Sequence, residues 1–73
     1  MSEYIVKLIW DNEAGVWVAT SDDVPGLALE SGSLDALIER SRFAIPELLS
    51  LNGPSDEVVS VCFRSERYEK VAV

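Results

Sequence analysis

Histidine is absent from the 73 residues of this sequence, and cysteine occurs once, as Cys62. A single cysteine excludes an internal disulfide, and without histidines it leaves too few of the usual ligands for a zinc site. Histidine is also the commonest general base, so catalysis by a histidine-activated nucleophile is excluded. The sequence therefore predicts no metal site, no cofactor and no catalytic residues of these kinds.

Basic residues are scarce as well. The chain has 6 lysines and arginines against 13 acids, which gives a net charge of −7 at pH 7. Contacts to phosphates dominate nucleic-acid affinity, so we expect no direct binding of nucleic acid. An acidic surface suits a basic protein partner, although acidity also keeps a small domain soluble. The sequence has no membrane-length apolar run and no leader-like segment before Glu3, which predicts a cytoplasmic protein without membrane contact.

The acids do not form the pattern of a metal-dependent nuclease. Such an enzyme needs several carboxylates that converge on paired metal ions. Here the acids fall in predicted loops and on a predicted helix, and residues 4–10, the first predicted strand, contain none. Asp22 and Asp23 are the most suggestive pair, yet adjacent acids before a Pro-Gly turn typically solvate the turn. We therefore predict that the protein is not an enzyme.

Apolar periodicity predicts three strands, one helix and a fourth strand. Val24-Pro25-Gly26 suits the centre of a type II turn, and Ser33 suits a helix N-cap. The predicted strands cover residues 4–10, 16–20, 27–31 and 57–63, and the helix covers residues 34–49 before a closing Asn-Gly-Pro segment at 52–54. Three sequential strands, a helix and a right-handed crossover to a parallel last strand give a two-layer α+β domain. We expect one domain over residues 1–73, with a mostly antiparallel sheet and the helix packed on one face.

The predicted helix has an apolar stripe and two irregularities. The stripe repeats at helical spacing and consists of Leu34, Leu37, Ile38, Ser41, Ile45, Leu48 and Leu49. Pro46 lacks a backbone donor, so it should bend or interrupt the helix. Phe43 falls on the polar face with Glu39 and Glu47, where it needs either a bend that turns it inward or a partner that covers it.

The small size of the chain predicts self-association. A domain of this length buries only about 60% of its unfolded-chain surface, and without disulfides or metals it needs another source of stability. We therefore expect a homo-oligomer, a dimer or larger. The candidate interface residues are apolar and flank the first hairpin or close the chain: Trp10, Trp17, Val71 and Val73. The tail, residues 65–73, pairs at a sheet edge in its own chain or a neighbour's, or it frays.

Three segments of the sequence resemble the HicB-type antitoxins and their stand-alone HicB-like relatives. They are Asp23-Val24-Pro25-Gly26, Ser33-Leu34-Asp35-Ala36-Leu37 and Ala44-Ile45-Pro46-Glu47-Leu48-Leu49. The resemblance covers residues 3–64 and implies a partly degraded ribonuclease-H-like fold of order β-β-β-α-β without nuclease activity. It also implies binding to a small basic mRNA-cleaving toxin of the HicA type, and oligomerisation. Full antitoxins continue into a DNA-binding domain, which this chain lacks, so operator binding is not expected.

Two functions follow as expectations. The first is a non-catalytic, acidic antitoxin-like module that neutralises a small basic toxin. Its candidate partner-binding surface combines acids with the exposed aromatic residue of the helix: Asp22, Asp23, Glu30, Glu39, Phe43 and Glu47. The alternative is a self-assembling small domain of another role, which binds a small molecule at a subunit junction near Trp10 and Trp17.

Overall fold

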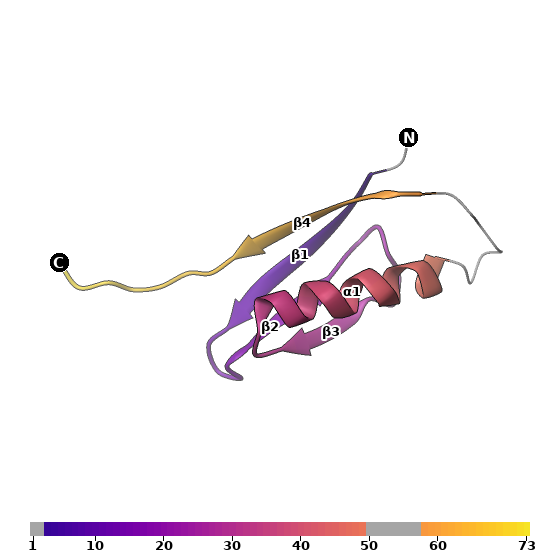
Figure 1. The fold of residues 1–73 in the computed structure, drawn as a ribbon. Helices are drawn as coiled ribbons and strands as arrows, with labels where there is room; N and C mark the ends of the chain where they lie inside the picture. Colours follow the sequence, from indigo (N-terminus) through magenta and orange to yellow (C-terminus); the bar gives the residue numbers. More distant parts are fainter. Residues whose placement is uncertain (1–2, 50–57) are drawn as a thin grey trace.

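The computed structural model describes residues 3–49 and 58–73 of the chain. Its elements appear in the order predicted from the sequence (Figure 1). They are β1 (Glu3–Asp11), β2 (Val16–Thr20), β3 (Ala28–Ser31), α1 (Leu34–Leu49) and β4 (Ser60–Glu66). No helix in the described part of the chain has the length and apolar character needed to cross a membrane.

The four strands form one mixed sheet in the order β3-β2-β1-β4. β2 is antiparallel to both β1 and β3, while β4 is parallel to β1. The helix lies between β3 and β4 in the chain and packs over β2 and β3 on one face of the sheet (Figure 1). A strand, helix and strand crossover sets the last strand parallel to a neighbour, as predicted. The predicted two-layer α+β fold is therefore confirmed.

The core lies between α1 and the sheet. Along β1, side chains alternate between the two faces, and Val6 and Leu8 point toward the helix with 0% and 1% of their surface exposed. Ala19 of β2, together with Leu37 and Ile45 of α1, completes the centre of this layer. Burial of each large apolar side chain contributes about 1.5–3 kcal/mol, so this layer stabilises the contact between helix and sheet.

Both predicted local signals before α1 are present. The Leu27 amide donates to the Val24 carbonyl at 3.2 Å, and Gly26 has a φ of 88°, the positive value that a type II turn requires at its third residue. At the start of the helix, the Ser33 Oγ accepts a hydrogen bond from the Ala36 amide at 3.2 Å. This bond satisfies one of the unpaired amides of the first turn, so Ser33 is the N-cap.

The helix continues through Pro46 to Leu49, so interruption at the proline does not occur. Proline removes only the hydrogen bond that its own amide would donate one turn back. The turn beyond it is held by packing, because Leu48 and Leu49 lie against the core. The closing segment predicted at 52–54 lies outside the described residues.

The last strand is displaced from its predicted position. The prediction ended at Phe63 because a charged residue follows, but β4 runs from Ser60 to Glu66. β4 is at the edge of the sheet, so Arg64 and Glu66 reach solvent while their backbones still pair with Lys7 and Ile9 of β1. Residues 67–73 continue as an exposed segment that forms no strand within the described chain. Of the two pairings predicted for it, the one within its own chain is therefore absent.

Candidate functional site

The solvent side of α1 carries two acids with an aromatic residue between them. Glu39, Phe43 and Glu47 are spaced by four residues, so they lie above one another on one helix face, which we call the helix stripe. The Phe43 side chain is 70% exposed. The expectation that a bend turns this ring inward is therefore wrong, because the helix keeps its direction of burial through Leu37, Ser41 and Ile45 on the opposite side.

The charges of the helix stripe are open to solvent. Glu39 forms an ion pair with Arg42 at 3.7 Å, and both side chains are more than half exposed, 62% and 69%. An exposed pair of this kind contributes at most about 0.5 kcal/mol to the helix. The Glu39 carboxylate can therefore exchange Arg42 for a cation on another molecule at little cost.

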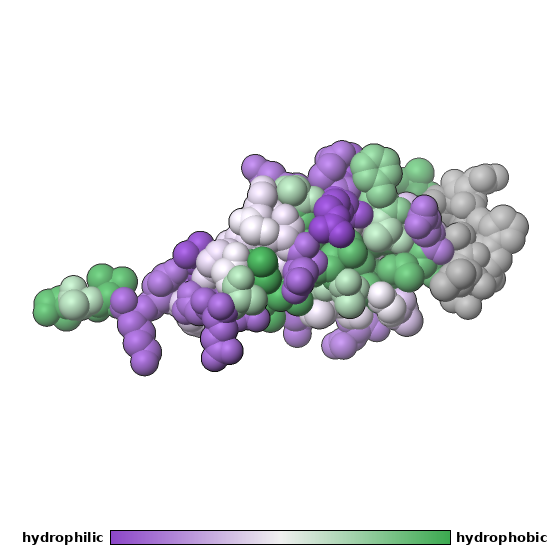
Figure 2. All heavy atoms as spheres, turned by 90° about the horizontal axis from the view of Figure 1, so that it is seen from below, coloured by the Kyte–Doolittle hydropathy of each residue, from purple (hydrophilic) through white to green (hydrophobic). Residues whose placement is uncertain are grey.

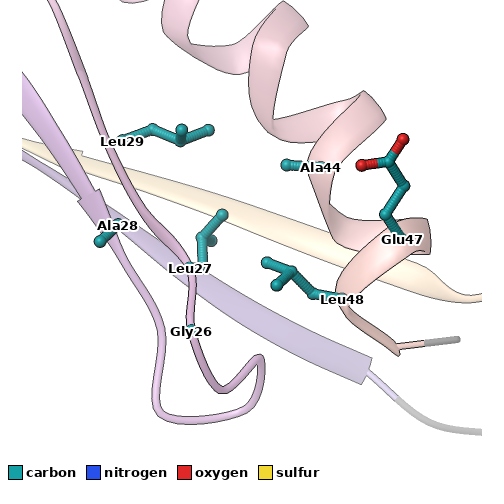
Figure 3. A pocket seen from close by; sticks show the side chains of 7 residues that line it. All are labelled: Gly26, Leu27, Ala28, Leu29, Ala44, Glu47 and Leu48. Carbon is teal, nitrogen blue, oxygen red and sulfur yellow. The ribbon is translucent and has the colours of Figure 1, made fainter. Parts of the chain in front are cut away.

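A hollow of about 350 Å³ lies beside the helix stripe, between β3 and α1. Leu27 and Leu29 enter it from the strand side, and Leu48 enters it from the helix (Figure 3). Its remaining lining residues are Gly26, Ala28, Ala44 and Glu47. Apolar walls with one carboxylate at the rim suit an apolar side chain from a partner that also carries positive charge.

The loop before β3 ties the sheet together. The Asp23 Oδ2 accepts a hydrogen bond from the Ile5 amide at 2.8 Å, and the Ser21 Oγ donates one to the Ile5 carbonyl at 2.6 Å. The Ser21 Oγ also accepts from the amides of Asp23 and Val24. Sequence reasoning placed Asp23 on the partner surface and missed this structural role. A serine two residues before an aspartate, at the start of a turn, is the local signal for it.

The six residues predicted as a partner surface do not lie on one face. Glu39, Phe43 and Glu47 form the helix stripe, while Asp22 and Asp23 belong to the β2–β3 loop. Glu30 is on the sheet face opposite the helix, because its neighbour Leu29 packs into the core. Over residues 3–49 and 58–73, no three side chains of the metal-binding types lie together.

The two tryptophans meet at the end of the first hairpin. Trp10 and Trp17 are directly opposite on β1 and β2, with ring centroids 5.5 Å apart at an interplanar angle of 63°. The Arg67 guanidinium lies 4.2 Å from the centroid of the Trp10 ring, and the Trp10 indole donates to the Asn12 Oδ1. Such a cation–π contact contributes about 0.5–1 kcal/mol at an exposed site. The predicted interface residues thus divide, with the tryptophans paired on the sheet and Val71 exposed on the tail.

Comparisons with known proteins place the fold more firmly than the function. A family described as a domain of unknown function, DUF1902, matches residues 3–73. A crystal structure of the hypothetical protein TTHA1013, from the extremely thermophilic bacterium Thermus thermophilus, is 43% identical to this chain. That alignment covers 99% of this chain and 100% of the other, with a TM-score of 0.72. No curated protein matches.

Proposed function

Since the chain belongs to the DUF1902 family of domains of unknown function, we propose its function from its surface. We propose that it is a non-catalytic, antitoxin-like module that binds and neutralises a small basic mRNA-cleaving toxin. The order β-β-β-α-β agrees with the fold that the resemblance to HicB-like proteins implies, a partly degraded ribonuclease-H-like domain. Residues 4–10 of the central strand β1 carry no carboxylate, which agrees with a domain of this type that lacks nuclease activity.

The observation that carries this proposal is the exposed Phe43 ring between two carboxylates. Aromatic side chains are enriched among the residues that supply most of the binding energy in protein interfaces. Carboxylates around such an anchor favour a positively charged partner and speed its association. Phe43 therefore acts as the anchor, and Glu39 and Glu47 select a basic protein.

The hollow between β3 and α1 supplies a second anchoring point on the same side of the molecule. Glu47 belongs both to the helix stripe and to the rim of this hollow, so the two features are continuous. A partner can place one apolar side chain against Leu48 and another against Phe43 while its basic residues face the acids. The net charge of −7 on the whole chain adds long-range attraction to such a partner.

The test is co-purification from the native cell with matched variants. Tagged wild-type protein should recover a stoichiometric small basic protein, and expression of that protein alone should arrest growth. Phe43→Ser combined with Glu39→Lys should lose the partner and fail to rescue growth. Ile9→Ser is the control, because Ile9 is 41% exposed on the sheet face away from the helix, so this variant should retain the partner. Unchanged binding by the Phe43 and Glu39 variant would show that the surface is assigned wrongly.

A second candidate function is binding of a small molecule beside the tryptophan pair. The observation in its favour is the Arg67 guanidinium on the Trp10 ring, next to Trp17, which together offer a cation and two aromatic faces. A ligand with an aromatic ring and an anionic group fits this chemistry. Its binding should raise the midpoint of thermal unfolding and change tryptophan fluorescence, and Trp10→Leu should abolish both effects.

A further inference from the structure

The edge of the sheet at β4 continues into an exposed tail. β4 has one sheet neighbour, β1, so within the described chain its outer side is unpaired. Residues 67–73 extend from it away from the body of the protein, with hydrophilic residues along the segment and hydrophobic ones at its end (Figures 1 and 2). Tyr68 and Val71 are 77% and 78% exposed. An open edge that leads into exposed apolar residues favours pairing with another strand.

The tail keeps the side-chain alternation of a strand. Arg67 forms an ion pair with Glu69 at 2.7 Å, and the Tyr68 hydroxyl donates to the Glu66 Oε2 at 3.2 Å. Both contacts join residues two apart, which share a face in extended backbone. Arg67 also covers Trp10, so the odd-numbered residues of the tail project on the helix side of the sheet.

The charges of this segment are antisymmetric about Tyr68. The order Glu66-Arg67-Tyr68-Glu69-Lys70 places opposite charges at equal distances on the two sides of the tyrosine. In an antiparallel pair of two copies with a two-fold axis at Tyr68, Glu66 of each copy lies opposite Lys70 of the other. Arg67 likewise lies opposite Glu69. Directly opposite residues of unlike charge stabilise an antiparallel pair, and like charges destabilise it.

Neighbouring registers bring like charges together. An axis at Arg67 puts the two Arg67 side chains opposite each other and sets Lys70 against Arg64. An axis at Glu69 puts the two Glu69 side chains opposite each other. Since a symmetric antiparallel pair must keep the faces of both strands matched, its axis falls on a residue. Of these three registers, only the one centred on Tyr68 pairs every charge of residues 66–70 with its opposite.

The same register covers apolar surface. With the axis at Tyr68, Val73 lies opposite Phe63 of the second copy, on the helix side of the sheet. Phe63 is half-buried there, because α1 packs over β2 and β3 at the other side of the sheet. The exposed valine and the uncovered part of the phenylalanine ring then bury each other.

We propose that two copies of this chain associate edge to edge through β4 and residues 67–73, in the register centred on Tyr68. The two sheets become one continuous sheet, and the helices of both copies lie on the same face. The helix stripe is on α1 and not at this edge, so the dimer stands independently of the proposed toxin binding.

The test is a charge swap measured by sedimentation equilibrium. Glu66→Lys and Lys70→Glu each place two pairs of like charges in the dimer, so each should raise the dimer dissociation constant by about tenfold or more. The double variant E66K/K70E restores opposite charges and should restore wild-type affinity. An equimolar mixture of the two single variants should form heterodimers. Arg42→Glu, the same kind of charge change on α1, should leave the dissociation constant unchanged.

A cross-linking experiment tests the register directly. In a Cys62→Ser background, Tyr68→Cys should form a disulfide between copies under mild oxidation, and Val71→Cys should not. A wild-type monomer at roughly 100 μM overturns the proposal, as does a charge-swapped double variant that binds as weakly as the single variants. Efficient cross-linking through position 71 instead of 68 overturns the register.

Discussion

Replacement of Ser41 by alanine should stabilise the protein. Ser41 lies on the buried side of α1 with none of its surface exposed, and its Oγ has no hydrogen-bond partner among the described residues. A buried hydroxyl without a partner costs about 1–3 kcal/mol in protein mutational data. Alanine removes this cost and favours the helix by a few tenths of a kcal/mol more, while the lost oxygen leaves a gap smaller than a methyl group. We therefore expect Ser41→Ala to raise the free energy of unfolding by about 1–2 kcal/mol.

For a domain of this length, 1 kcal/mol shifts the midpoint of thermal unfolding by about 4–8 °C, so the expected rise is roughly 4–16 °C. Circular dichroism at one fixed protein concentration measures it, because self-association makes the midpoint depend on concentration. Ser33→Ala is the matched control on the same helix. It removes the 3.2 Å N-cap bond to the Ala36 amide and should destabilise the protein by about 1 kcal/mol. An unchanged or lowered midpoint for Ser41→Ala would refute the reasoning, since it would mean that the hydroxyl is satisfied.

Three further substitutions test the loop and the helix stripe. Asp23→Ala should lower the free energy of unfolding by about 1–2 kcal/mol in urea titrations, because the Ile5 amide loses its acceptor, whereas Asp23→Asn keeps an acceptor and should lose less. Gly26→Ala should cost about 1–2 kcal/mol in the same assay, since a φ of 88° is strained for alanine and its Cβ would lie 3.4 Å from Leu48. Phe43→Ser should change stability by less than about 0.5 kcal/mol, because the ring is 70% exposed, and a large loss would mean that Phe43 supports the fold.

The predictions that succeeded depend on local patterns. The strand predicted at residues 16–20 matches β2, and the strand at residues 4–10 lies within β1. Residues 4–10 are apolar on most positions of both faces, which is typical of a central strand, and β1 is central in the sheet. Likewise, the turn at Val24 and the cap at Ser33 use only backbone groups a few residues away, so the sequence contains the whole of each signal.

The predictions that failed depend on which elements meet. Whether Arg64 ends a strand depends on its place in the sheet, and at an edge it does not. Whether Asp23 is free depends on the Ile5 amide, which lies 18 residues away in the chain. The separation of Glu30 from the helix stripe follows from the alternation of β3, but only once the helix is known to cover the face of Leu29. Local periodicity contains no information on such contacts.

The distribution of charge connects the two proposed surfaces. Residues 64–70 hold three of the six basic residues of the chain but only two of its thirteen acids. The rest of the chain, which includes the helix stripe, is therefore more acidic than the net charge of −7 indicates. Two molecules with this net charge repel each other, and that repulsion is weakest where the bases are concentrated. The self-complementary segment lies in that part of the chain, whereas the exposed aromatic residue of α1 lies in the acidic part, where a basic partner is attracted and a second copy is repelled.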